Sequence, residues 1–246
     1  MLLDPKDVRV FFTLHRALMF FVNQKLEVIP DRPANPNEYS SLSPDTRVKV
    51  HDAFIKHTEL IQLFVDENPP GFSRDQLDII LSWRHLVHGR FFVFRELKNY
   101  TVFLSTERPP IAYGVLALLE PFEDLIGPYL PVMVETILLP FKNQIIYDGA
   151  MSRFNITFGG GIRHGLNEDF KEAKARHGIV ASLPLADKPT GGIDAPVVEH
   201  RGQKKLGKVS MQEELTEIKR ETRKLKTRLS GLQRRRSEVE KALGDG

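Results

Sequence analysis

The stretch RFFVFRELKNYTVFLST, residues 90–106, contains two runs of aromatic and β-branched residues separated by Lys98 and Asn99. Such runs favour strands, and a short connection between them is typical of an antiparallel hairpin. Runs of the same kind follow at IAYGVLAL (111–118), PVMVETILLPF (131–141), QIIYDG (144–149) and RFNITFG (153–159), and EPFEDLIG (120–127) interrupts them as a short helix. The pattern predicts a mostly antiparallel β-meander, which could curl into a small barrel.

The residues on either side of this region predict helices. Apolar residues recur at helical spacing in three N-terminal segments, each preceded by a good capping residue: Asp4, Ser43 or Ser73. We therefore predict helices over residues 5–26, 44–68 and 74–88, with a loop rich in Pro, Asn and Ser between the first two. A further helix is predicted over LNEDFKEAKARHG, residues 166–178, where Gly178 is placed to end it.

These segments predict an α+β fold with four regions along the chain. The helical region, residues 1–89, and the β-rich region with its closing helix, residues 90–183, are expected to form one compact body. Residues 184–208 are rich in Pro and Gly and show no periodicity, which is typical of a flexible linker. Residues 209–246 are expected to form a coiled coil.

The C-terminal segment has the strictest periodicity in the chain. Apolar residues recur at alternating spacings of four and three residues, and only two of these positions, Thr222 and Arg236, are not apolar. This is the period of a supercoiled seam rather than of a lone amphipathic helix, although a solvated single helix is the alternative. The predicted oligomerisation residues are Met211, Leu215, Ile218, Thr222, Leu225, Leu229, Leu232, Arg236, Val239 and Leu243.

Charges beside this seam favour pairing with a second copy of the chain. In a parallel dimer Glu214 of one helix attracts Lys219 of the other, but Arg236 faces Arg236 of the other helix and repels it. In an antiparallel dimer Arg236 lies opposite Ile218, and the flanking charge pairs attract again. The sequence therefore predicts a homo-oligomer, with a dimer favoured, and leaves the orientation of the two helices open.

The chain carries a mildly acidic body and a basic tail. Residues 1–200 contain 21 Lys/Arg and 25 Asp/Glu, a net charge of −4, whereas residues 201–246 contain 14 and 7, a net charge of +7. Basic residues can contact nucleic-acid phosphates, and the candidates are Lys204, Lys205, Lys208, Arg234 and Arg235. Glycines interrupt the basic stretch before the heptads, unlike the continuous basic helix of zipper proteins that bind DNA. A solvated basic face is therefore the favoured interpretation.

A glycine-rich segment, FGGGIRHGL, offers a possible anion site before the last helix of the body. Free N–H groups and the helix dipole can bind an anion there, and the candidate residues are Gly159, Gly160, Gly161, Arg163 and His164. The spacing matches neither phosphate-loop motif. Glu168 and Asp169, expected in the first helical turn, would also repel a phosphate. A turn that needs a positive φ, where glycine has no steric cost, is the simpler interpretation.

Two further groups could carry chemistry, and each has a simpler interpretation. His85 and His88 are spaced as metal ligands on a helix, but no third ligand follows, so core or interface histidines are favoured. Glu135 and Asp148 on neighbouring strands could hold Mg²⁺ or form an acid–base pair. An Asp-Gly turn explains Asp148 more simply. We assign no catalytic residue, metal or cofactor from the sequence.

The sequence also bears on where the protein resides. It contains no cysteine, which excludes disulfides and thiolate metal sites and fits a reducing interior. The N-terminal residues MLLDPKDVRV lack the pattern of a signal peptide. Arg9, His15 and Arg16 interrupt the most apolar window, residues 8–26, so we interpret it as a buried helix. A cytoplasmic protein without membrane association is expected.

The segments SWRHLVHGRFFVFRELKNYTVFLS, LPVMVETILLPFKNQIIYDG and FNITFGGGIR resemble an uncharacterised bacterial protein family, over about residues 5–183. The resemblance implies a recurring bacterial unit with an added tail, and it brings no activity, ligand or catalytic residue. We therefore expect a non-catalytic assembly or adaptor protein that self-associates through the coiled coil. A nucleic-acid-binding factor that uses the basic tail and the glycine-rich turn is the alternative. A metal-dependent hydrolase or nuclease is the weakest hypothesis.

Overall fold

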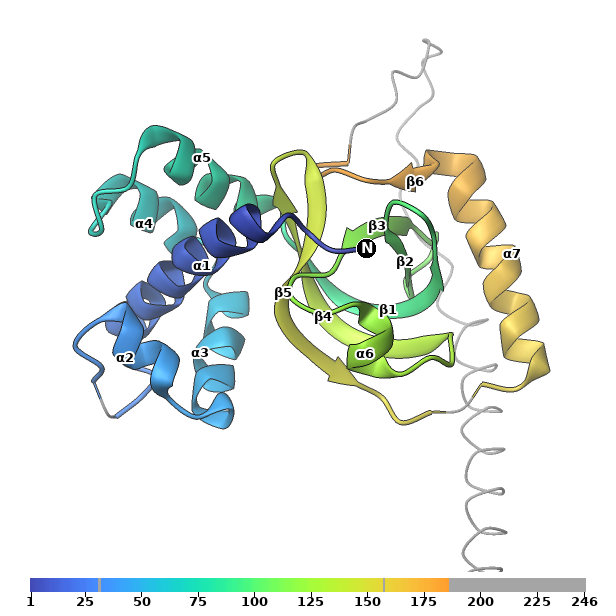
Figure 1. The fold of residues 1–246 in the computed structure, drawn as a ribbon, viewed down its shortest axis with the longest axis horizontal. Coiled ribbons are helices and arrows are strands. Elements are labelled where there is room, and N and C mark those ends of the chain that lie inside the picture. Colours follow the sequence, from blue (N-terminus) through green and yellow to red (C-terminus); the bar gives the residue numbers. More distant parts are fainter. Residues whose placement is uncertain (31, 157, 186–246) are drawn as a thin grey trace, which may run out of the picture. The chain divides into compact units, whose positions relative to one another are not determined.

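The computed structural model describes residues 1–185 except 31 and 157, all within one compact unit, Met1–Pro189 (Figure 1). The fold is mixed α+β with a helical N-terminal half, as predicted, and its strands form a mixed sheet of 6 strands. The helices are α1 (Pro5–Leu26), α2 (Pro36–Ser41), α3 (Pro44–Lys56), α4 (Leu60–Glu67), α5 (Arg74–Ser82), α6 (Phe122–Ile126) and α7 (Gly160–His177), with a 3₁₀ turn, η1 (Trp83–His85). The strands are β1 (Val87–Glu96), β2 (Thr101–Ser105), β3 (Ala112–Leu116), β4 (Val132–Phe141), β5 (Gln144–Arg153) and β6 (Ile179–Val180). The predicted coiled coil, and the linker from residue 186 onward, lie outside the described residues.

The N-terminal helices begin at the residues that the sequence marks as caps. The Asp4 side chain accepts from the backbone N–H of Lys6, and Ser73 forms a reciprocal capping box with Gln76. The single helix predicted over residues 44–68 is wrong, because the chain breaks at His57 into α3 and α4. The predicted loop before it contains the short helix α2. The third predicted helix is also too long, since β1 already begins at Val87.

The strands form a ring of pairings rather than a simple meander. β1 pairs with β2 and β4, β4 pairs with β5, and β2 pairs with β3, all antiparallel, while the parallel pairing of β3 with β5 closes the ring. β6 extends the sheet beside β3, again in parallel. The sheet is therefore mostly antiparallel, as predicted, with the order β2-β1-β4-β5-β3-β6.

The end of the sheet differs from the prediction. β5 continues past Gly149 to Arg153, the first residue of RFNITFG, and the described residues after Arg153 in that segment form no strand. Its aromatic residues pack onto the sheet instead: the Phe158 ring lies 5.4 Å from that of Phe92, and Phe154 lies under the Arg90 guanidinium. Side-chain packing thus takes the place of strand pairing for these residues.

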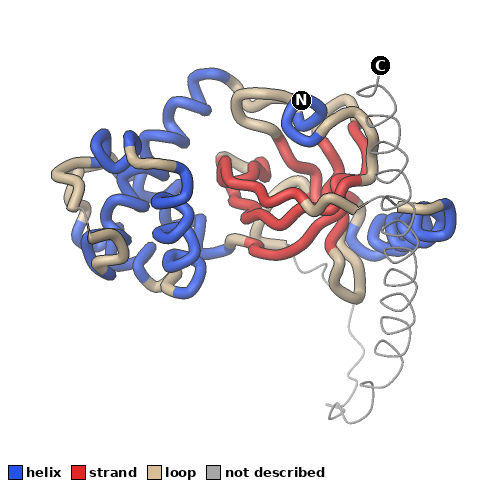
Figure 2. Tube along the Cα trace, turned by 90° about the horizontal axis from the view of Figure 1, so that it is seen from below, coloured by secondary structure: helices blue, strands red, loops and turns tan. Residues whose placement is uncertain are grey.

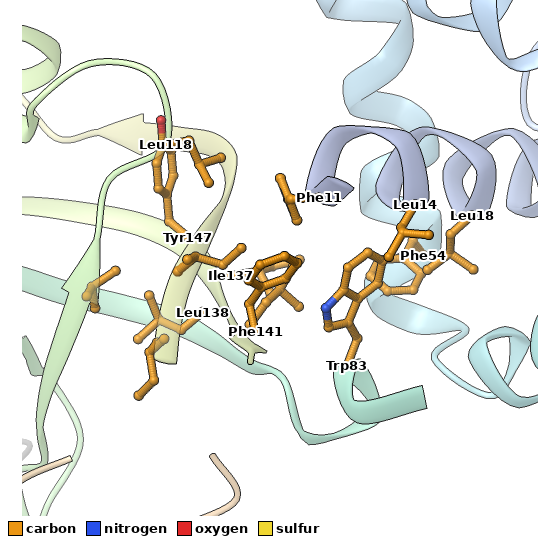
Figure 3. Packing of buried hydrophobic residues seen from close by; sticks show 14 of the residues in the cluster. Phe11, Leu14, Leu18, Phe54, Trp83, Leu118, Ile137, Leu138, Phe141 and Tyr147 are labelled. Atoms are coloured by element: carbon orange, nitrogen blue, oxygen red, sulfur yellow. The ribbon is translucent and has the colours of Figure 1, made fainter. Parts of the chain in front are cut away.

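Two apolar clusters hold the body together. The larger cluster joins α1 to the strands, because the Phe11 ring packs on both Trp83 and Phe141 (Figure 3). The distances between the ring centroids are 5.8 Å to Trp83 and 6.2 Å to Phe141. The smaller cluster packs Leu166, Phe170 and Ala173 of α7 against the opposite face of β1, β2 and β3. Helices α1–α5 therefore gather on one side of the strands and α7 on the other (Figure 2).

Candidate functional site

A bulge in β5 places a carboxylate where a regular strand would not. Thr136 pairs with Met151 and Leu138 with Tyr147, so three residues of β5 lie opposite a single residue of β4. Gly149, at the centre of the bulge, has φ +90, a conformation that side chains with a Cβ rarely adopt. Asp148 Oδ1 accepts from the backbone N–H of Ala150 at 3.1 Å and is fixed by it. Bulges commonly redirect a side chain in this way.

Asp148 forms a buried pair with His51 of α3. The Oδ2 atom of Asp148 is hydrogen-bonded to Nε2 of His51, and the side chains are 1% and 17% exposed. Burial lowers the pKa of His51, but the hydrogen bond and charge of Asp148, together with the charge of Asp52, outweigh burial and raise it. The imidazole is therefore favoured in its charged form and is held in one orientation by Asp148.

His15 of α1 adds a second imidazole of opposite character. Its ring stacks on Phe11 at 5.2 Å and meets the edge of Trp83 at 6.1 Å. Burial lowers the pKa of His15 to about 4, which the charge of Asp148 only partly opposes. His15 is therefore neutral near pH 7. Within the described part of the chain its ring nitrogens make no hydrogen bond.

These three side chains line a cavity of about 660 Å³ between α1, α2, α3 and strands β4 and β5. Each long helix contributes residues at helical spacing, which places them on one face: Phe12, His15, Arg16 and Met19 from α1, and Arg47, Val48, His51, Asp52 and Ile55 from α3. Val48 and Leu119 are 48% and 67% exposed and give the opening an apolar rim. Polar groups thus converge in a cavity with apolar walls, the usual composition of a ligand site.

Tyr39 of α2 supplies a further polar group to the cavity wall. Burial raises the pKa of Tyr39 to about 12, although the charge of Arg47 opposes this shift. The phenol therefore keeps its proton at neutral pH and can donate a hydrogen bond.

Glu135 and Asp148, suggested by the sequence as a pair, both line this cavity but have separate partners. Glu135 binds Arg90 at 3.0 Å and lies 3.8 Å from His88 Nε2. His88 lines the cavity as well, whereas His85 does not. No three His, Asp or Glu side chains in the described residues are placed to share a metal ion.

The glycine-rich segment lies away from this cavity. Helix α7 begins at Gly160, earlier than predicted, and Gly159 precedes it with φ −72. The expected positive φ is therefore wrong for this triplet, since positive-φ glycines in the described residues occur elsewhere. Arg163 and His164 are exposed near the helix start.

The acidic residues of α7 also differ from their expected placement. Asp169 binds Arg108, and Glu168 binds Lys171 at 2.9 Å. Neither acid lies in the first turn, because α7 begins eight residues before Glu168. The predicted nucleic-acid and oligomerisation residues, 204–243, lie outside the described part of the chain.

Sequence reasoning missed His15, His51, Arg16 and Arg47 as site residues. The sequence contained a signal for them. His15 and Arg16 lie on the otherwise apolar face of α1, and Arg47 and His51 are four residues apart in α3. The pattern alone did not indicate that these two faces meet β5.

Comparison with protein-family models, curated proteins and solved structures finds no match for this chain. Among the described residues, no helix has the length and apolar character needed to span a membrane.

Proposed function

We propose that the body of this protein binds a small molecule in the cavity between α1, α3 and β5. One observation carries the proposal: a bulge in β5 buries Asp148 against His51 at the wall of a cavity of about 660 Å³. Burying an ion pair costs free energy that an apolar pair would not, so such pairs are weak devices for stability. Titratable groups with shifted pKa values in a concave site are instead typical of functional sites.

The two imidazoles suit different contacts with a bound molecule. His51 is oriented by Asp148 through Nε2, while its Nδ1, 4.0 Å from Asp52, makes no hydrogen bond within the described residues. As an imidazolium it can donate a hydrogen bond or a proton from Nδ1. Neutral His15 can accept one. The site therefore combines a charged donor with a neutral partner in one cavity.

Protein-observed NMR on the full chain with neutral, anionic and cationic aromatic fragments tests this function. We expect shifts in the amide signals of Ala150 and Met151 and in the His51 ring. Val48→Trp at the rim of the cavity should abolish them, and Leu63→Trp, which is also an exposed apolar position but lies on α4 outside the cavity, should not. Fragments that bind nowhere near these residues, or that bind Val48→Trp unchanged, contradict the proposal.

A second proposed function, self-association, rests on the heptads of residues 211–243. A continuous stripe of leucines in water favours a partner helix, and we propose a homodimer on that basis. Analytical ultracentrifugation of the full chain beside a chain that ends at residue 200 tests it. The full chain should sediment as a dimer and the shorter chain as a monomer, and a monomeric full chain contradicts it.

The nucleic-acid alternative ranks below both. A ring order of β1-β2-β3-β5-β4 with a helix before β4 has the connectivity of oligonucleotide-binding barrels, which use the outer face of the second and third strands. Here α7 covers that face with Leu166, Phe170 and Ala173. This alternative therefore depends on the basic tail and on the exposed Arg163 and His164 of the glycine-rich segment. Affinity for mixed DNA and RNA that falls steeply with salt would support this alternative.

A further inference from the structure

The carboxylates of the cavity already have cationic partners. Asp148 is hydrogen-bonded to His51, and Asp52 lies 4.0 Å from the other nitrogen of the same ring. Glu135 binds Arg90 at 3.0 Å, with His88 at 3.8 Å. Each of these carboxylates therefore lies beside a basic side chain, with Asp148 and Asp52 sharing the single imidazole of His51.

The two guanidinium groups of the cavity are not compensated in the same way. Arg16 donates only to the neutral Oδ1 of Asn37, at 3.3 Å, and Arg47 makes neither a hydrogen bond nor an ion pair within the described residues. Arg47 nevertheless acts on the cavity, because its charge lowers the pKa of both His15 and Tyr39. Arg16 adjoins His15 on the cavity face of α1. Among the described residues, two guanidinium groups without an acidic partner thus line the cavity, and they come from two different helices.

We propose that the molecule bound in this cavity is an organic anion whose phosphate or carboxylate group is held by Arg16 and Arg47. The inference rests on the proposed function of the cavity. A guanidinium presents a planar fork of N–H donors that matches the oxygens of either group. His51, oriented by Asp148, adds a third donor when it is protonated. The organic part of the ligand lies against the apolar rim formed by Phe12, Val48 and Leu119. The cavity volume of about 660 Å³ is typical of sites that bind small organic molecules.

Four aromatic probes of similar size distinguish the charge that the site prefers. Phenyl phosphate and benzoate carry the two anionic groups, benzyl alcohol is neutral, and benzylamine is a cation. Dissociation constants are measured on the full chain by NMR titration at pH 7. At least one anion should bind roughly tenfold more tightly than benzyl alcohol, and the difference between phenyl phosphate and benzoate identifies the group.

Charge-removing variants locate the anion. Arg47→Gln and Arg16→Gln should each weaken binding of the tighter anion by roughly tenfold and leave benzyl alcohol unchanged. Lys49→Gln, an exposed cation of α3 outside the cavity, is the matched control and should change neither. Arg47 holds no partner in the described fold, so its variant should fold normally even if Arg16→Gln perturbs the contact with Asn37.

The outcomes separate this inference from the function on which it rests. Benzyl alcohol or benzylamine bound in the cavity as tightly as the anions, or anion binding unaffected by Arg47→Gln, overturns the anion inference and leaves a ligand cavity in place. No binding by any probe, together with a negative fragment screen, overturns both.

Discussion

Replacing Asp148 by asparagine removes one negative charge from the buried pair and keeps the shape of the side chain. The asparagine oxygen can still accept from the Ala150 N–H, so the bulge is retained. The amide NH2 group of the new side chain can donate a hydrogen bond to Nε2 of a neutral His51. A charged His51 carries a proton on Nε2, and the NH2 group cannot accept it. The effect of Asp148→Asn on the free energy of unfolding must therefore depend on pH.

The magnitude follows from the protonation state of His51. In the wild type the raised pKa of His51 adds stability that is fully present below the unfolded value of 6.5 and is lost as pH rises through the folded value. At pH 5.5 the variant loses a charged hydrogen bond in a buried site, worth about 2–3 kcal/mol. At pH 9 less of the charge on His51 remains, so the variant mainly exchanges a carboxylate acceptor for an amide and should lose less, about 1 kcal/mol. For a body of this size the loss at pH 5.5 lowers the Tm by roughly 5–10 °C.

Urea unfolding of wild type and variant at both pH values measures the difference, and NMR titration of the His51 ring reports its protonation directly. The pKa of His51 should fall below the ordinary value in the variant, because burial then acts without Asp148. Asp124→Asn, an exposed carboxylate of α6, is the control and should change stability by less than about 0.5 kcal/mol. Equal losses at pH 5.5 and pH 9, or an unchanged titration of His51, would refute the reasoning.

Other substitutions test the surroundings of the site. Burial holds the pKa of His15 at about 4, so the folded state loses stability as pH falls from 6.5 to 4. His15→Leu should remove this loss. In urea unfolding, the variant should therefore gain roughly 3 kcal/mol relative to wild type over that interval. Phe11→Ala should cost about 3–5 kcal/mol in the same assay, because its fully buried ring contacts both Trp83 and Phe141. Gly165→Ala, with open space around the added methyl group inside α7, should raise stability by about 1 kcal/mol. Gly114→Ala should instead cost about 1–3 kcal/mol, since its Cβ would lie 2.8 Å from Tyr100 Cγ; a Tm unchanged by either glycine substitution contradicts the packing described here.

Elements whose signals are local could be predicted from the sequence. Helix α1 follows from its cap at Asp4 and its apolar period, and β1, β2 and β4 follow from runs of aromatic and β-branched residues. The break between α3 and α4 could not be predicted, because the helical period continues through His57 without a proline or glycine. Packing in the folded body decides such a break, and Phe54 and Ile61 on either side are both buried.

The bulge shows how a correct local preference can give a wrong structure. Asp148-Gly149 was interpreted as a turn because glycine tolerates positive φ, and Gly149 does have φ +90. The same backbone preference serves a turn or a bulge, and only the pairing of β5 with β4 decides between them. The site therefore escaped prediction: His51 and Asp148 are separated by 97 residues, and no local pattern brings them together.

The continuous core explains how the site can contain a pair that is costly to bury. Phe11, Trp83 and Phe141 join the helices to the strands beside the cavity, independently of His51 and Asp148 (Figure 3). Phe54 of α3 and Tyr147 of β5 belong to the same apolar cluster, so the ion pair is not the sole contact between the helices and the strands. An apolar pair at these two positions would satisfy the same packing at a lower desolvation cost. An imidazole and a carboxylate at these two positions, beside Arg16 and Arg47, therefore support the proposed ligand site.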